Sequence, residues 1–189
     1  MGRIFCSYFA QIKIEEKREE NKMYKSMKQP IRKWKGHSLL KWVEDYVLVD
    51  IETTGLSPTY NDIIEIGAIK VKENEIIDTY ESLIKIEEPL SPFITHLTGI
   101  TDKMLQKGKE REEVLQEFIE FAGEDILIGH NVNFDINFLY DKCEKYIDTY
   151  LTNDFIDTMR LARKILPNSP NYQLRDTSKR FRSSLYTCS

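Results

Sequence analysis

The sequence is poor in cysteine, and its three cysteines are not spaced for a common task. Cys6, Cys143 and Cys188 lie far apart, and no Cys-x-x-Cys pair occurs. Disulfide frameworks and zinc sites both need cysteines at recurring spacings. We therefore expect neither in this chain, and the cytosol, where thiols stay reduced, is the simplest location.

Long hydrophobic runs are missing as well. The chain has no stretch of roughly 18 consecutive apolar residues, the length that a membrane-spanning helix requires. The apolar part of residues 1–10 is too short for the core of a signal peptide. The sequence thus predicts a protein that neither spans a membrane nor is exported.

A surplus of positive charge is the third absence. The chain carries 27 Lys and Arg against 31 Asp and Glu, a formal net charge of −4. Binding nucleic acid through bulk electrostatics needs a surplus of cations to neutralise phosphates. The composition argues against that mode of binding, but it is compatible with an enzyme whose metal ions neutralise phosphate locally.

The residues that are present suffice for one globular domain. With 189 residues, of which 41% are hydrophobic, the chain can bury a substantial core. Residues 1–38 are rich in Lys, Arg and Glu, and we interpret them as a charged extension that is solvated or disordered. The expected domain covers residues 39–181, and residues 182–189 form an irregular tail.

Apolar periodicity predicts a mixed α/β domain. Three β-favouring segments at 46–51, 63–71 and 76–86 have short connections, which favours an antiparallel meander. The first is an almost continuous apolar run, typical of a strand buried on both faces. Helices and strands then alternate, which places helices on the sheet. These later segments are helices at 110–122, 133–146 and 158–165 and strands at 126–129 and 155–157.

Two carboxylates interrupt the first strand. Asp50 and Glu52 are two residues apart, so they leave the same face of the strand, with Cα atoms about 6.6 Å apart. Like charges at the end of a buried strand are costly unless a cation lies between them, and Mg²⁺ prefers carboxylate oxygens. The alternative is that Asp50 caps the following turn and Glu52 points to solvent, which is the commoner case for an isolated Asp-x-Glu.

A second group of polar residues lies where a later strand ends and a helix begins. It reads His130-Asn131-x-x-Phe134-Asp135, and ligands of open α/β sheets bind at such junctions. Asp135, in the first helical turn, could reach a metal held by the first pair, and we expect the three carboxylates to converge on a common centre. Asn and Asp are also ordinary helix-cap residues. The presence of both groups in one chain favours a site.

These residues resemble a known family. Residues 50–55, Asp-Ile-Glu-Thr-Thr-Gly, and residues 130–135, His-Asn-Val-Asn-Phe-Asp, resemble the first two motifs of the DEDD superfamily of 3′-to-5′ exonucleases. The resemblance is to the epsilon proofreading subunit of bacterial DNA polymerase III and to the exonuclease domain of PolC-type polymerases. Residues 96–101 and 157–163 are similar to further segments of that branch. The resemblance covers residues 46–181 and implies a ribonuclease-H-like fold of five mixed strands, a three-strand antiparallel meander followed by parallel strands.

The resemblance also implies roles for individual residues. Asp50, Glu52 and Asp135 would be catalytic ligands of two Mg²⁺ or Mn²⁺ ions. The implied activity removes nucleotides from DNA 3′ ends during proofreading or repair. Single-stranded DNA or a DNA 3′ end would be the partner, and a DNA polymerase or a helicase module is a further candidate. The residues implied in binding the terminal nucleotide are Thr53, Thr54, Gly55, Thr98, Asn131 and Phe134.

One part of the family pattern is missing. The family completes its site with a third motif, a His followed about five residues later by an Asp, on a helix near the C-terminus. His130 is the last histidine of this sequence, so no such pair follows the second motif. We interpret residues 182–189 as a premature or frame-shifted ending. We expect slow or absent cleavage, an uncovered sheet face and self-association through that face.

Three hypotheses remain open at this point. The first is a 3′-to-5′ exonuclease, and the second is a non-catalytic module of the same fold that binds nucleic acid or a polymerase. The third is an unrelated metal-dependent phosphohydrolase that uses Asp50 and Glu52. The sequence does not decide between DNA and RNA as the substrate.

Overall fold

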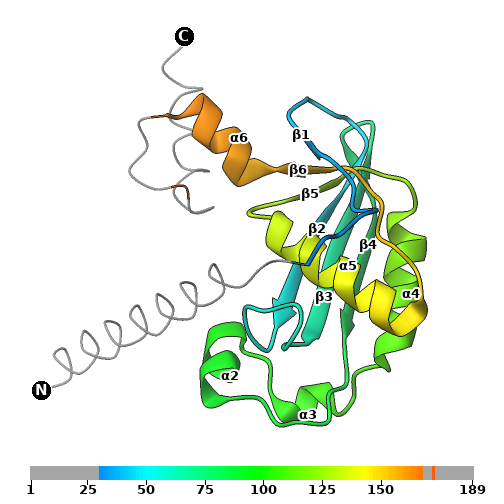
Figure 1. The fold of residues 1–189 in the computed structure, drawn as a ribbon, viewed down its shortest axis with the longest axis vertical. Coiled ribbons are helices and arrows are strands. Elements are labelled where there is room, and N and C mark those ends of the chain that lie inside the picture. Colours follow the sequence, from blue (N-terminus) through cyan, green and yellow to red (C-terminus); the bar gives the residue numbers. More distant parts are fainter. Residues whose placement is uncertain (1–29, 168–171, 173–189) are drawn as a thin grey trace, which may run out of the picture.

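The fold is a mixed sheet flanked by helices (Figure 1). The computed structural model describes residues 30–167 and residue 172. Within these residues, no helix has the length and apolar character needed to cross a membrane. The strands are β1 (Ser38–Leu39), β2 (Tyr46–Thr53), β3 (Ile63–Lys72), β4 (Glu75–Leu83), β5 (Leu127–Gly129) and β6 (Phe155–Asp157). The helices are α2 (Pro92–Thr98), α3 (Asp102–Leu105), α4 (Arg111–Ala122), α5 (Asn133–Ile147) and α6 (Thr158–Ile165).

The strands form one sheet in the order β1-β6-β5-β2-β3-β4. β2, β3 and β4 make an antiparallel meander, while β5, β6 and β1 add parallel strands. Glu73 and Asn74, the two residues between β3 and β4, have φ angles of 50° and 66°, typical of the tight hairpin turn that matches strand twist. The expected fold class is confirmed, with a sixth strand in addition to the five expected.

One face of the sheet carries the core. Val47, Val49 and Ile51 of β2 are buried in a cluster with Phe118 of α4 and Phe138 of α5. Figure 1 shows α4 and α5 side by side along the sheet. Burial of this cluster is the main source of stability, since each large apolar side chain contributes about 1.5–3 kcal/mol.

The opposite face of β2 is not buried in the described part of the chain. Leu48 and Asp50 are exposed there, so the prediction that this strand is buried on both faces was wrong. An apolar run shows that a strand can be buried, but the layers that pack on it decide which faces are covered. Whether molecules associate through this face stays a prediction.

The sixth strand comes from the charged N-terminal segment. Arg32 donates two hydrogen bonds of 2.6 Å to the carboxylate of Asp141 on α5. Lys35 Nζ donates to the side-chain oxygens of Asn133 and Asn137, both at 2.6 Å. β1 then pairs in parallel with β6. The expected domain boundary after residue 38 therefore falls inside β1. Residues 1–29 and 182–189, the rest of the expected extension and tail, lie outside the described residues.

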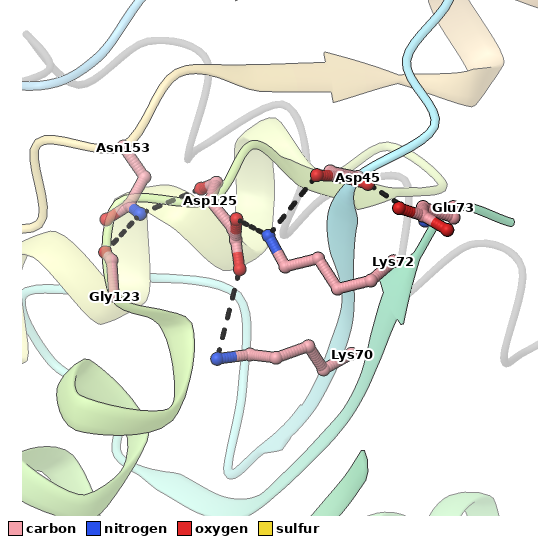
Figure 2. A network of polar contacts seen from close by, with 7 residues as sticks. All are labelled: Asp45, Lys70, Lys72, Glu73, Gly123, Asp125 and Asn153. Carbon is pink, nitrogen blue, oxygen red and sulfur yellow. Dashed lines mark hydrogen bonds and ion pairs between the residues drawn. The ribbon is translucent and has the colours of Figure 1, made fainter. Parts of the chain in front are cut away.

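A polar network fixes the end of the sheet at which β2 begins (Figure 2). Lys72 Nζ, at the end of β3, lies 2.5 Å from Asp125 Oδ1 and 3.7 Å from Asp45 Oδ2. Lys70 Nζ lies 3.8 Å from the other oxygen of Asp125. Asn153 donates from its side chain to the carbonyl oxygen of Asp125. The network thus ties β3 to the segments that lead into β2, β5 and β6.

The docking of the N-terminal segment predicts a cost for a side chain at Gly36. A Cβ atom there would lie 2.0 Å from the backbone oxygen of Asn153, so the segment would have to move. We expect Gly36→Ala to lower the free energy of unfolding by about 1–3 kcal/mol, as other overpacked sites do. Urea unfolding of the full chain measures this. Gly67→Ala is the matched control, because its Cβ would meet no atom closer than 3.9 Å. Equal stability of the two variants would show that residues 32–39 do not pack as described.

Candidate active site

The carboxylates of β2 lie on the uncovered face of the sheet. Val49 and Ile51 point into the core, whereas Asp50 is exposed and Glu52 is half-buried. The shared face expected from the spacing of Asp50 and Glu52 is confirmed. Partial burial raises the pKa of Asp50, and burial followed by the charge of Asp50 raises the pKa of Glu52.

Asp135 joins the second motif to the same strand. Its side chain is buried in the first turn of α5, and its Oδ1 accepts a hydrogen bond of 3.1 Å from the backbone N–H of Ile51. Ile51 is the residue between Asp50 and Glu52. Burial and then the charge of Asp50 raise the pKa of Asp135 to about 8, while the backbone N–H groups of Asp135 and Ile51 oppose the rise. The structure thus brings both motifs to one place.

Further acidic residues, which belong to neither sequence motif, lie on the same face. Glu65 of β3 is directly opposite Glu52, and Glu81 of β4 is opposite Gly67, the partner of Asp50. Burial, then Glu81 and then Asp50 raise the pKa of Glu65. The pairing of a period-two meander could have revealed this cluster, because it aligns alternate residues across three strands.

An open groove runs over this face. Its volume is about 670 Å³, and Asp50, Glu65 and Glu81 line it together with His130 at the end of β5. His130 Nδ1 lies 3.1 Å from Thr158 Oγ1, which donates to the carbonyl oxygen of Gly129. The groove thus has an acidic wall and apolar parts. Its apolar lining includes Leu48, Val49, Ala68 and Ile69.

The donor types fit a hard divalent cation. Asp50, Glu52 and Asp135 offer carboxylate oxygens, and none of them has a Lys or Arg partner within the described residues. Burial raises the pKa of all three, and the charge of Asp50 adds to the rise at Glu52 and Asp135. They are not arranged as a finished cage, since the described chain holds no group of three His, Cys, Asp or Glu placed to bind a metal. The three carboxylates therefore fit a divalent cation in their donor type and in lying near one another.

The turn that follows β2 is closed by its own hydrogen bonds. Thr53 Oγ1 donates to the carbonyl oxygen of Gly55 at 2.7 Å. Two hydrogen bonds of 2.9 Å join Thr54 and Asp62. The Thr54 N–H donates to the backbone carbonyl oxygen of Asp62, and the Asp62 N–H donates to Thr54 Oγ1. A Cβ at Gly55 would lie 2.7 Å from the side chain of Asn61, so the turn leaves no room for one.

The second motif begins in a strained loop that a buried aspartate holds. Asn131 has a φ angle of 62°, and its N–H donates to Asp157 Oδ1 at 3.0 Å. The same oxygen accepts from the N–H of Met159, which caps α6. Sequence reasoning gave Asp157 no part in the site. Its place directly before a predicted helix indicated a cap, but not the contact with residue 131.

The remaining predicted substrate residues make contacts within the fold. Phe134 is half-buried and packs against Phe138, with ring centroids 4.9 Å apart. Thr98 donates to the carbonyl oxygen of Ile94 and accepts from the N–H of Ile100, so its hydroxyl is engaged at the end of α2. The structure records no contact of Thr98 with the acidic cluster among the described residues.

The sequence also matches a family as a whole. The sequence model of RNase_T, described as exonuclease, covers residues 47–185 of this chain. The chain belongs to this exonuclease family. The family and the enzyme class expected from the motifs, a hydrolytic nuclease, are therefore confirmed.

Two curated relatives of this exonuclease domain are PolC-type DNA polymerases III. The protein from Bacillus subtilis (strain 168) is 43% identical over 153 residues, which are 80% of this chain and 11% of the relative. The protein from Latilactobacillus sakei subsp. sakei (strain 23K) is 41% identical over 141 residues, 75% of this chain and 10% of the relative. The chain thus spans about a tenth of the length of the curated relatives it matches.

Solved exonuclease structures share the fold. Exonuclease X in complex with 5′ overhanging duplex DNA matches with a TM-score of 0.56 and 26% identity, over 71% of this chain and 73% of that one. Product-bound exonuclease I matches with a TM-score of 0.61 over 72% of this chain and 38% of that one. At 18% identity the second likeness speaks for the fold alone. Together with the sheet topology, these matches confirm the ribonuclease-H-like architecture.

The buried carboxyl of Asp135 predicts a pH-dependent stability. Its pKa rises from an ordinary 3.8 to about 8 on folding, so its stabilising contribution is present below the first value and is lost as the pH rises through the second. In EDTA, we expect the free energy of unfolding to fall by up to about 1.4 kcal/mol per pH unit in this window. Asp135→Asn should flatten that slope, as measured by urea unfolding from pH 5 to 8. The exposed Asp78→Asn is the control, and an equal slope in all three proteins would contradict the assignment.

Proposed function

We propose that this domain is a metal-dependent 3′-to-5′ exonuclease that removes nucleotides from DNA 3′ ends. The observation that carries the proposal is the meeting of Asp50, Glu52 and Asp135 at β2 in a member of an exonuclease family. The polymerase relatives and the DNA-bound exonuclease X support DNA as the substrate. A DNA polymerase is a candidate partner on the ground of the polymerase relatives, and a helicase module is the further candidate named from the sequence.

In this proposal the acidic residues hold Mg²⁺ or Mn²⁺, with two ions in a complete site. When bound, such ions activate a water and neutralise the charge on the leaving 3′ oxygen. Asp50 and Glu52 offer their oxygens on the open face, where a phosphodiester can approach. Asp135 contributes from the buried side, held by the Ile51 N–H.

The substrate end is proposed to lie against the turn after β2. Thr53, Thr54 and Gly55 offer backbone groups there, and Phe134 and Asn131 shape the other side of the nucleotide pocket. Thr98 would contact the substrate from α2. Ser91, the N-cap residue of that helix, lines the same cavity of about 630 Å³ as Thr54. The cavity lies beside the turn after β2, and its lining does not include Asp50, Glu52 or Asp135.

A non-catalytic module with the same fold is the second candidate. No histidine follows residue 130, so residues 131–189 do not supply the histidine that serves as general base in the third motif. A general base contributes roughly 10² to 10⁴ in rate. A module that binds a DNA end or a polymerase without cutting would need the fold and the turn but not that base.

The activity is tested with a 5′-labelled single-stranded DNA oligonucleotide in Mg²⁺ or Mn²⁺. We expect stepwise shortening from the 3′ end, reduced at least about 100-fold in Asp50→Ala, because a metal ligand is lost. Glu44→Ala is the matched control, an exposed carboxylate two residues before the same strand. Metal binding without shortening would favour the non-catalytic module, and hydrolysis of nucleotides but not of polymers would favour a phosphohydrolase acting on mononucleotides. An RNA oligonucleotide of the same sequence decides between the two nucleic acids.

The role of Phe134 is tested by affinity for a single-stranded end. If its ring stacks on the terminal base, Phe134→Ala should weaken binding by about 1–3 kcal/mol, the contribution of one stacked base. Fluorescence anisotropy with a labelled oligonucleotide measures this. Phe138→Leu perturbs the same packed pair from its fully buried side and controls for a loosened core. Equal affinity of folded Phe134→Ala and the unsubstituted protein would remove Phe134 from the pocket.

A further inference from the structure

We propose that Lys142 is a positioning residue, which holds the turn carrying Thr54 at a fixed place relative to the helix carrying Asp135. The inference rests on the proposed function, because that turn is the part proposed to receive the terminal nucleotide. Lys142 has no part in the metal chemistry and lies outside both sequence motifs.

Lys142 is a lysine buried in the middle of α5, with 4% of its surface exposed. Its Nζ donates to Asp62 Oδ1 at 3.0 Å. Lysine is almost never buried to this extent without a partner, since an unpaired buried ammonium is costly. The sequence separation of 80 residues makes this contact a property of the fold and not of a local turn.

Asp62 passes the constraint on to Thr54. It is the last residue before β3, and its backbone forms both of the 2.9 Å bonds that close the turn on Thr54. A displacement of Asp62 therefore displaces Thr54 with it. The side chain of Asp62 points to the helix while its backbone holds the turn, so one residue links the two.

The helix carries both attachments on one side. Asp135 and Lys142 are seven residues apart, nearly two turns, which places them on the same face of α5 about 10.5 Å apart along its axis. Asp135 binds the N–H of Ile51 in β2, and Lys142 binds Asp62 beyond the turn. These two contacts therefore fix the positions of β2, the turn after it and α5 relative to one another.

Asp62 has a second cationic partner besides Lys142. Arg111 of α4 lies 3.5 Å from Asp62 Oδ2, and its guanidinium stacks 4.3 Å from the ring centroid of Tyr146. If Lys142 is lost, the carboxylate of Asp62 keeps this weaker partner. We therefore expect loosening of the turn and not unfolding of the domain.

Hydrogen exchange of the full chain tests the link without reference to activity. The reporters are the amides of Thr54 and Asp62, which form the two closing bonds. We expect their exchange to be at least about 10-fold faster in Lys142→Met, largely restored in Lys142→Arg, and unchanged in Lys145→Met, an exposed lysine of the same helix. Asp62→Asn should give the same acceleration without a change in α5, which keeps the test valid if Lys142→Met folds poorly. Unchanged exchange in both variants overturns the proposal.

End discrimination tests the consequence for the substrate. The affinity of a labelled oligonucleotide is measured with a 3′-hydroxyl and with a 3′-phosphate end, and the ratio should fall about 10-fold in Lys142→Met and Asp62→Asn. Faster exchange with an unchanged ratio overturns the positioning role. Absence of 3′-end shortening by the unsubstituted protein would refute the proposed function instead, and hydrogen exchange would still decide whether Lys142 holds the turn.

Discussion

The hydrogen bond from the Ile51 N–H to Asp135 is the contact on which the site depends. It joins residues of the two sequence motifs that are 84 positions apart, and it does so through a backbone group that only a substitution by proline would remove. The bond also explains why Asp135 can stay buried, because one of its oxygens has a donor there. The backbone N–H groups of Ile51 and of Asp135 itself do not offset the burial and the neighbouring charge of Asp50, which raise the pKa to about 8.

The acidic face brings like charges close together at a cost in stability. A chain with a net charge of −4 places Asp50, Glu52, Glu65 and Glu81 on one open face of a meander, where Glu52 and Glu65 lie directly opposite each other. Like charges in that position destabilise a sheet by tenths of a kcal/mol to about 1 kcal/mol. Local arrangements that cost stability in this way are common at functional sites.

The sequence predicted what depends on local chemistry. The meander followed from alternation and short turns, and the common face of Asp50 and Glu52 followed from the period of a strand. β1 was missed because it is two residues long and depends on Asp141, an ion-pair partner 109 residues from Arg32. The contacts of Lys142 with Asp62 and of Asp157 with Asn131 were missed for the same reason, because these residues belong to no paired motif that indicates a shared site.

The docked segment at residues 32–39 bears on how this domain is isolated. The family match begins at residue 47, within β2, so a fragment cut to that match would lack β1 and Arg32. It would leave the backbone edge of β6 unpaired and Asp141 without its cation. Unpaired edges recruit other strands. Aggregation of such a fragment would therefore reflect where it was cut and not an inability of the exonuclease domain to fold.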